Sequence, residues 1–431
     1  MGDYFIHHFI ERSKASSSQP AFRYKIGEEW ISYTWGDIYE RCNCVISLIN
    51  RNTRGGDYIG ILGKNSFNWI VADYSCLLSD RISMPFHIWM DRENLLHHLS
   101  YASLLFVDTD FLPLIRGEFP DEKIITLDKK YGDYRFIEEF YEEDIREDLI
   151  SSYVREIKDD EVTTVIFTSG SSGSCAGSLI TQGGLGFEIN SIKRLLIYDS
   201  ATDEQMVFMP FSQTLGRLAE IVPVAYGFPT VVVNLVDAEK LAADMKEVQP
   251  TVMVAYPDYF VYLRNAFEQV FETAPLYKKV GFEAIAHLKL ENNKLAKKFK
   301  ELIKTTVRRY LGKNLRFFIC GGGRLDESIV DYFESLKMPI LTGYGMAETT
   351  GATHLNTIEK RKRGSVGLPL EGIETRIGED SHIYIRGPNL MKGYLNDKRK
   401  PAFTPDGWLR TDDVGEIDSE GFLFLKTQKV R

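Results

Sequence analysis

Cysteine is scarce in this chain of 431 residues, and its spacing indicates no metal site. Cys42 and Cys44 are close together, but no histidine or further cysteine completes a metal-ligand pattern around them. Cys76, Cys175 and Cys320 are scattered through segments of expected secondary structure. We therefore expect buried, reduced thiols, which are typical of cytosolic proteins, and predict a cytoplasmic location.

Long apolar runs and clusters of basic residues are also missing. The N-terminal segment MGDYFIHHFIERSK lacks the long apolar core of a signal peptide. The most apolar region, residues 220–236, is interrupted by proline, glycine and asparagine, so we expect no membrane span. A net charge of −9 without a basic block argues against a dedicated nucleic-acid-binding protein.

The composition that remains, 44% hydrophobic and 26% charged, is that of an ordinary globular protein. Short apolar runs alternate with segments of helical spacing, which predicts parallel sheets covered by helices. Strands are expected at 58–62, 82–86, 104–108, 124–127, 163–167, 230–235, 251–256, 315–320 and 339–341. After Gly364, short runs between turn residues predict an antiparallel unit. The predicted fold class is α/β, with two parallel or mixed sheets flanked by helices and a small distorted β-barrel.

A loop made almost entirely of Ser, Thr, Gly and Ala follows one predicted strand. The strand is the β-branched run Thr163–Phe167, and the loop extends from Thr168 to Ser178. Such a loop can turn backbone N–H groups and hydroxyls towards an anion, and its glycines allow a close approach. No Gly-Lys-Ser/Thr follows, so this is not the P-loop of nucleotide hydrolases. Composition alone would also fit a flexible linker.

Two further predicted strands end in glycine-rich turns. Residues 315–320 lead into Gly321-Gly322-Gly323, and residues 339–341 lead into Thr342-Gly343-Tyr344-Gly345. In open parallel sheets, ligands bind beyond the carboxyl ends of the strands. We therefore expect both turns and the hydroxyl-rich loop to face one crevice.

A long helical insertion is expected at about Pro257–Gly312. Its apolar face runs from Leu295 to Tyr310, and its basic residues lie mainly on the other side. The basic stripe consists of Lys297, Lys298, Lys304, Arg308 and Arg309. Such a stripe could contact an anionic ligand or a membrane surface peripherally, but it is more often the solvated side of an amphipathic helix.

Several motifs occur in a characteristic order. They are TSGSSG (168–173), TGYGMAETTG (342–351), GSVGLPLEG (364–372), IYIRGPNLMKGY (383–394) and GWLRTDDVGEID (407–418). Together they resemble the adenylate-forming superfamily of acyl- and aryl-CoA synthetases, luciferases and peptide-synthetase adenylation domains. The stretch 317–349 is most similar to long-chain acyl-CoA synthetases, and the resemblance covers nearly the whole chain.

The resemblance implies an AMP-forming acid–thiol ligase. A carboxylic acid, here a long-chain fatty acid, would attack the α-phosphate of ATP with Mg²⁺ present. The acyl-adenylate would then pass to a thiol, commonly that of CoA. The implied cofactors and partners are ATP, Mg²⁺, a fatty acid, and CoA or a carrier-protein thiol.

The family's phosphate and metal residues map onto two motifs. The residues that would hold the β- and γ-phosphates are Thr168, Ser169, Gly170, Ser171, Ser172 and Gly173. Glu348 would be the catalytic Mg²⁺ ligand, with Thr168 beside it, because Mg²⁺ prefers hard oxygen ligands. A structural alternative for Glu348 is a carboxylate at a helix start.

The remaining implied contacts surround the nucleoside and the acyl group. Gly321, Gly322, Gly323, Tyr344 and Gly345 would border the adenine, with Tyr344 stacking on it. Asp413 would accept hydrogen bonds from the ribose hydroxyls, unless it is only a turn residue. Gln213 and Gly343 would border the acyl pocket.

Several positions depart from the family pattern. Cys175-Ala176-Gly177 replaces Pro-Lys-Gly, which removes a lysine. Gln213 replaces a histidine and Ala347 a threonine, and Asp412 stands where Thr-Gly-Asp has glycine. Losing one charge-stabilising donor typically costs about 10²–10³-fold in rate. We therefore expect impaired catalysis, or a degenerate nucleotide- or acyl-binding homologue that acts as a scaffold or sensor, or an acyl-AMP ligase serving a carrier protein.

The expected domain organisation is one large adenylate-forming domain at 1–425. It comprises an α/β half at about 1–228 with phosphate loop 168–177, a second half at about 229–362, and a β-barrel-like unit at about 363–425. Residues 426–431 would be the start of a hinge, where Asp-Arg-x-Lys is replaced by TQKVR. The family's small C-terminal domain, with its catalytic lysine, would be absent.

Overall fold

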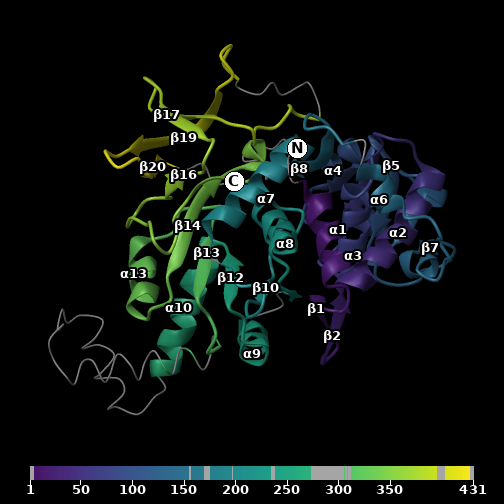
Figure 1. Ribbon diagram of the computed structural model, residues 1–431, viewed down its shortest axis with the longest axis horizontal. Helices are drawn as coiled ribbons and strands as arrows, with labels where there is room; N and C mark the ends of the chain where they lie inside the picture. Colours follow the sequence, from purple (N-terminus) through teal and green to yellow (C-terminus); the bar gives the residue numbers. More distant parts are fainter. Residues whose placement is uncertain are drawn as a thin grey trace.

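The computed structural model describes residues 4–154, 157–168, 175–196, 198–233, 238–272, 305, 308, 312–395 and 403–427. These residues form three β-sheets of seven, nine and four strands, with helices between and around them (Figure 1). The two larger sheets are mainly parallel and the smallest is antiparallel, so the predicted α/β class is confirmed.

The seven-stranded sheet has the order β7-β6-β5-β3-β4-β8-β9. Its strands are β3 (Tyr58–Leu62), β4 (Ile82–Pro85), β5 (Ala102–Val107), β6 (Ile124–Thr126), β7 (Arg135–Phe136), β8 (Val162–Phe167) and β9 (Gly177–Thr181). All neighbouring pairs are parallel except β8 and β9, which enclose the hydroxyl-rich loop as an antiparallel pair. Five of the nine strands predicted from the sequence lie in this sheet, each within two residues of its observed bounds.

The nine-stranded sheet has the order β16-β15-β14-β13-β12-β10-β11-β1-β2. Its strands are β1 (Pro20–Ile26), β2 (Glu29–Thr34), β10 (Gln205–Val207), β11 (Thr230–Val232), β12 (Val252–Ala255), β13 (Phe317–Cys320), β14 (Ile340–Gly345), β15 (Ala352–Leu355) and β16 (Leu368–Pro369). Strands β14 to β1 are parallel along this order. Because β1, β2 and β10 precede residue 228, the sheet boundary does not coincide with the division into halves expected there.

The longer helices lie mostly between the two large sheets or along their outer faces (Figure 1). They are α1 (Phe5–Ala15), α2 (Trp35–Asn52), α3 (Phe67–Leu77), α4 (Arg92–Leu99), α7 (Gln182–Leu195), α8 (Thr214–Tyr226), α9 (Ala238–Val248), α10 (Pro257–Glu272) and α13 (Glu327–Ser335). Shorter helical segments are η1 (Thr109–Phe111), α5 (Leu112–Ile115), η2 (Asp121–Lys123), η3 (Ile137–Phe140), α6 (Leu149–Tyr153) and η5 (Ala347–Thr349). Side chains of Ser66 and Asp326 cap α3 and α13, which fixes where those helices begin.

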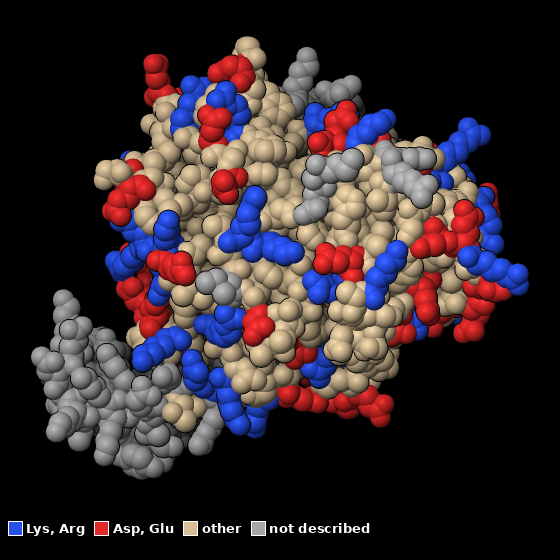
Figure 2. Space-filling model, in the orientation of Figure 1, with Lys and Arg blue, Asp and Glu red and all other residues tan. Residues whose placement is uncertain are grey.

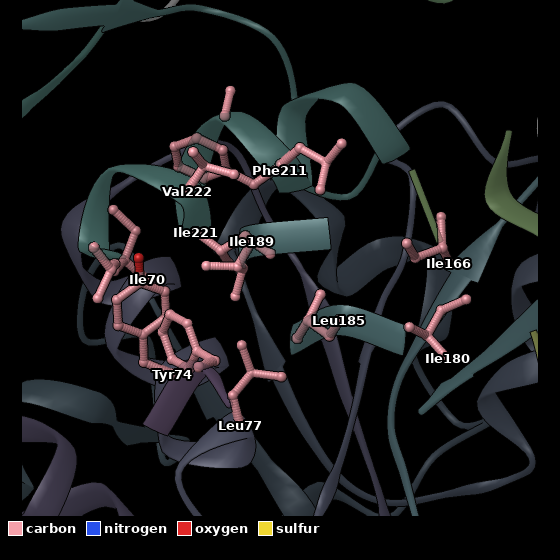
Figure 3. Packing of buried hydrophobic residues seen from close by; sticks show 14 of the residues in the cluster. Ile70, Tyr74, Leu77, Ile166, Ile180, Leu185, Ile189, Phe211, Ile221 and Val222 are labelled. Atoms are coloured by element: carbon pink, nitrogen blue, oxygen red, sulfur yellow. The ribbon is translucent and has the colours of Figure 1, made fainter. Parts of the chain in front are cut away.

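One continuous core fixes α8 against its neighbours (Figure 3). Ile221 and Val222 of α8 lie near Ile189 of α7, with Ile70 and Tyr74 of α3 in the same cluster. The phenol of Tyr74 donates to the Glu220 carbonyl at 3.1 Å, which ties α3 to α8 inside this core. These contacts fix the middle of α8, and its first residues, Thr214 and Leu215, line the site described below.

The four-stranded antiparallel sheet confirms the β unit predicted after Gly364. Its order is β17-β18-β19-β20, with bounds Glu374–Ile377, His382–Arg386, Leu409–Ile417 and Leu423–Thr427. Between β18 and β19, residues 392–395 pair with β9 of the seven-stranded sheet. The C-terminal unit is therefore connected directly to the sheet that carries the hydroxyl-rich loop.

The expected insertion is only partly described. Its first helix is α10, whereas the apolar face at 295–310 and the basic stripe lie outside the described residues, apart from Arg308. None of the described helices combines the length and apolarity needed to cross a bilayer. Acidic and basic side chains are intermixed on the face in Figure 2, in keeping with the lack of a basic block in the sequence.

Candidate active site

A cavity of about 390 Å³ opens at the carboxyl ends of the strands. The ends of β8, β12, β13 and β14 border it, and the start of α8 and the first half of β19 close its sides. This is where an open parallel sheet places a ligand. The cavity brings together Thr168, Gly321, Gly343, Glu348 and Gln213, which were selected from separate motifs.

Two glycines of the turns, Gly322 and Gly345, lie at positions that leave no room for a side chain. Gly322 has φ +78°, and a Cβ there would lie 2.8 Å from the Tyr256 ring. A Cβ at Gly345 would lie 1.8 Å from the Gly351 carbonyl oxygen. Gly345 lines the cavity with Gly321 and Gly322, whereas Gly323 does not. The turns therefore allow a flat ligand to approach the main chain closely.

The base of the hydroxyl-rich loop is closed by hydrogen bonds across it. The backbone N–H of Thr168 donates to the Ala176 carbonyl at 2.9 Å, and the Ala176 N–H donates to Thr168 Oγ1 at 3.2 Å. The Cys175 thiol donates to the Thr168 carbonyl at 2.9 Å. Thr168 lines the cavity, while Ser169–Gly173 lie outside the described residues.

Two buried histidines hold the same base, and sequence reasoning missed both. His87 Nε2 lies 3.1 Å from the Phe167 carbonyl oxygen, and His98 Nε2 lies 3.0 Å from that of Cys175. Because a carbonyl only accepts, Nε2 carries the proton in both rings. His87 Nδ1 then accepts from Ser212 Oγ at 3.1 Å.

Burial keeps both rings neutral. Desolvation lowers the pKa of His87 to about 4 and moves the pKa of His98 below its usual value. Neutral rings hold the base of the loop without adding charge there. The only sequence signal was the position of His87, directly after a predicted strand.

Glu348 lies in the short turn η5 and lines the cavity, partly buried. Tyr394 donates its phenol O–H to Glu348 Oε1 at 2.8 Å, and the Met391 N–H donates to the Glu348 carbonyl at 2.9 Å. The described residues contain no cluster of three or more His, Cys, Asp or Glu side chains suited to a metal. A single carboxylate still fits Mg²⁺, which usually takes one or two carboxylates plus phosphate oxygens and waters.

Asp413 does not line the cavity directly. It is fully buried, and Tyr344 donates its phenol O–H to Asp413 Oδ2 at 2.8 Å. Tyr344 itself lines the cavity, as do Arg410, Thr411 and the exposed Asp412. Contact between Asp413 and a ribose therefore requires the Tyr344–Asp413 pair to rearrange.

The other end of the cavity is apolar. Gln213, the residue before α8, also lines the cavity, and its Oε1 accepts a hydrogen bond from the Tyr256 phenol. Much of the remaining lining is aliphatic, namely Ile192, Leu196, Leu215, Leu218, Ala219, Val222 and Val254. This end suits an alkyl chain, because burying each methylene is worth about 0.8 kcal/mol.

A buried carboxyl supports the turn that carries Glu348. Glu188 of α7 accepts hydrogen bonds from Asn389 Nδ2 at 2.7 Å and from the Ala352 N–H at 3.0 Å. Burial raises the pKa of Glu188 to about 8, although both hydrogen bonds lower it. The carboxyl therefore keeps its proton at neutral pH in the folded chain.

This raised pKa predicts a specific pH dependence of stability. Below about pH 4.5 the Glu188 carboxyl is protonated in both the folded and the unfolded chain, so its ionisation does not change the free energy of unfolding. Between about pH 4.5 and 8 only the unfolded chain releases it, so the free energy of unfolding should fall by about 3–5 kcal/mol across this window. Glu188→Gln should remove this decline, because glutamine does not ionise. The variant should also lose about 1–3 kcal/mol of stability at every pH, because its amide N–H would face another N–H donor.

Urea unfolding of both proteins at pH 5, 6, 7 and 8 measures the difference. The wild type should lose stability relative to Glu188→Gln as the pH rises. Parallel pH profiles would show that Glu188 already ionises normally in the folded protein.

Comparison with known proteins agrees with this geometry. The family model of AMP-binding enzymes matches residues 9–395. The long-chain-fatty-acid–CoA ligase FadD15 of Mycobacterium tuberculosis is 25% identical over 440 residues, which cover 94% of this chain and 72% of that protein. The long-chain-fatty-acid–CoA ligase ACSBG2 of Rattus norvegicus is 25% identical over 458 residues, which cover 97% of this chain and 68% of that protein.

Solved structures share the fold. The inhibitor-bound N-terminal domain of FACL13 from Mycobacterium tuberculosis superposes with a TM-score of 0.75 at 18% identity, over 100% of both chains. A second solved structure is that of O-succinylbenzoate CoA synthetase from Bacillus subtilis, in complex with ATP and magnesium ion. It superposes with a TM-score of 0.73 at 20% identity, and the match covers 97% of this chain and 78% of that one. The family model matches most of this chain, and residues from the separate motifs line one cavity. This chain therefore belongs to the AMP-binding enzymes, the adenylate-forming superfamily.

Proposed function

We propose that this protein activates a fatty acid with ATP and Mg²⁺ and transfers the acyl group to the thiol of CoA. The observation that carries the proposal is one cavity with two chemically different ends. Thr168, the glycine turns and Glu348 form a polar end, and α8 with its neighbours forms an apolar end. The relatives named above are long-chain-fatty-acid–CoA ligases, which supports the same assignment.

The proposed reaction has two steps at the junction of these ends. A carboxylate oxygen of the acid attacks the α-phosphorus of ATP, the bond to the bridging oxygen breaks, and pyrophosphate leaves. The thiol then attacks the acyl carbonyl carbon, the bond to the phosphate oxygen breaks, and AMP leaves while the thiol loses its proton. A single cavity with polar residues and a large aliphatic surface in its lining suits this sequence.

Each residue of the polar end has a proposed task. Glu348 would hold Mg²⁺, which would neutralise charge on the phosphate oxygens. Thr168, fixed by the two buried histidines behind it, would contact the phosphates together with the loop it begins. Tyr344 would lie against the adenine, and Asp413 would bind the ribose after releasing Tyr344. The exclusion of water by the apolar end would protect the adenylate from hydrolysis.

The charge of the cavity favours slow turnover. Of the described residues that line it, Arg410 is the sole lysine or arginine, against the carboxylates of Glu348 and Asp412. Nucleotidyl transfer depends on placed positive charge. This observation is the reason to retain a second candidate, a homologue that binds nucleotide and acyl chain without turnover. The free cysteines fit a reducing compartment such as the cytoplasm for either candidate.

Pyrophosphate exchange into ATP tests the assignment. The protein is incubated with Mg²⁺, ATP, labelled pyrophosphate and a panel of saturated fatty acids and aryl acids. Exchange that requires a fatty acid supports the ligase. Binding of ATP and fatty acid without exchange supports the second candidate, and binding of neither rejects both. Thioester formation is then measured separately, with CoA as the acceptor.

A further inference from the structure

We propose that Tyr394 is a positioning residue for Glu348, so that the carboxylate presents one defined oxygen to the metal ion of the bound nucleotide. The proposal rests on the proposed function, because it takes Glu348 as the residue that would hold Mg²⁺. Tyr394 also lines the cavity, but in this scheme its phenol is directed to Glu348 and acts on the ligand only through that carboxylate.

The first observation is how Glu348 is held. Its Oε1 accepts the phenol O–H of Tyr394 at 2.8 Å, and its carbonyl accepts the N–H of Met391 at 2.9 Å. Both donors belong to residues 387–395, which we call the strap. Oε2 has no hydrogen bond from any described residue, and Glu348 lines the cavity. The phenol therefore occupies one oxygen and leaves the other for a ligand.

The strap is anchored at its beginning to the turn that carries Glu348. The hydroxyl of Thr350 donates to the Asn389 carbonyl at 2.6 Å, and Asn389 Nδ2 donates to the buried Glu188. Thr350 has φ +59°, a left-handed conformation that a β-branched residue rarely adopts. The fixed strap holds this unfavourable turn in place, which makes the position of Glu348 well defined.

The strap is anchored at its other end to β9. The Lys392 N–H donates to the Leu179 carbonyl at 2.8 Å, the Leu179 N–H donates to the Gly393 carbonyl at 2.8 Å, and the Leu395 N–H donates to the Gly177 carbonyl at 2.7 Å. Strand β9 begins where the hydroxyl-rich loop ends. The strap thus connects the proposed phosphate loop with the proposed metal ligand, and Tyr394 is the side chain that completes the connection.

Hydrogen-bond partners of metal-ligating carboxylates and histidines typically change metal affinity about 10–100-fold when removed. Tyr394→Phe deletes one oxygen and leaves the ring in place. We expect this change to weaken the effect of the metal on nucleotide binding about tenfold. Nucleotide binding without metal should be unchanged, because the phenol does not contact the nucleotide in this scheme.

The experiment measures binding of a fluorescent ATP analogue by anisotropy, once in EDTA and once in saturating Mg²⁺, with no acid present. The ratio of the two affinities is the metal contribution. Tyr394→Phe should lower this ratio about tenfold. The control Tyr134→Phe removes a phenol bonded to the exposed Asp121 at 3.0 Å and should leave the ratio unchanged.

A double-mutant cycle with Glu348→Gln separates positioning from a general structural role. If Tyr394 acts through Glu348, adding Tyr394→Phe to Glu348→Gln should not lower the ratio of the two affinities any further. Additive losses, or a wild-type ratio in Tyr394→Phe, overturn the proposal. Melting curves verify folding. If Tyr394→Phe does not fold, Glu348→Asp moves the carboxylate away from the phenol instead, and wild-type metal dependence in that variant would likewise overturn the proposal.

The design also keeps this inference separate from the proposed function. A wild-type protein that binds the analogue equally with and without Mg²⁺ contradicts the metal role of Glu348 and therefore the proposed function. A wild-type protein with a clear metal contribution that Tyr394→Phe retains contradicts only the role of Tyr394.

Discussion

Replacing Glu348 with glutamine should lower the rate of adenylate formation about 10²–10³-fold, the usual cost of losing a group that stabilises transition-state charge. Glutamine has nearly the same shape, and its Oε1 can still accept from Tyr394. What it lacks is the negative charge that would hold Mg²⁺. The loss should therefore appear in pyrophosphate exchange and in Mg²⁺-dependent nucleotide binding, with the melting temperature little changed.

The matched control is Glu371→Gln, the same chemical change at an exposed position of the neighbouring GLPLEG motif. It should keep full exchange activity. If Glu348→Gln catalyses exchange at the wild-type rate and needs the same concentration of Mg²⁺, Glu348 does not bind the metal.

Phenylalanine in place of Ala219 should lower kcat/KM for long acids about 100-fold while sparing short ones. Ala219 lies on α8 in the apolar wall of the cavity and is nearly buried. If the added ring excludes about four methylenes of the substrate, the loss is about 3 kcal/mol, or roughly 100-fold in kcat/KM. The KM for ATP should not change, because the substitution is at the apolar end.

Short acids assayed with the same variant provide the internal control, since their alkyl groups end before Ala219. Ala219→Val, which adds less volume, should give an intermediate loss on long acids. The larger variant should cost about 1–3 kcal/mol in stability through overpacking, which urea unfolding measures. Equal losses on short and long acids would mean that the acyl chain lies elsewhere.

Much of the fold follows from local sequence pattern. Strand β3 has the bounds expected from a short apolar run followed by turn residues. Strand β19 was not predicted, because its buried face includes Thr411 and Asp413, so burial alternates without a hydrophobic alternation. Strand β14 extends to Gly345, beyond the expected end at residue 341, because its last residues pair with β15, with Gly345 opposite Ala352.

The candidate site, like the fold, could be predicted from the sequence only in part. Motif residues such as Thr168 and Glu348 could be selected from the sequence, since their spacing relative to strand ends is visible. His87, His98 and Tyr394 could not be assigned roles, because each acts on a group distant in sequence. The burial of Asp413 behind Tyr344 likewise depends on packing between two sheets, which no local pattern records.

The edge hairpin of the nine-stranded sheet also bears on how the chain folds. Strand β1 pairs with β11, with Phe22 opposite Thr230, so its partner is synthesised long after it. Until then the nascent chain carries an open β edge, and such edges are prone to pair with other chains. Folding of this protein should therefore be slow and sensitive to chain concentration, and a molecular chaperone that shields the amino-terminal hairpin during translation should raise its yield.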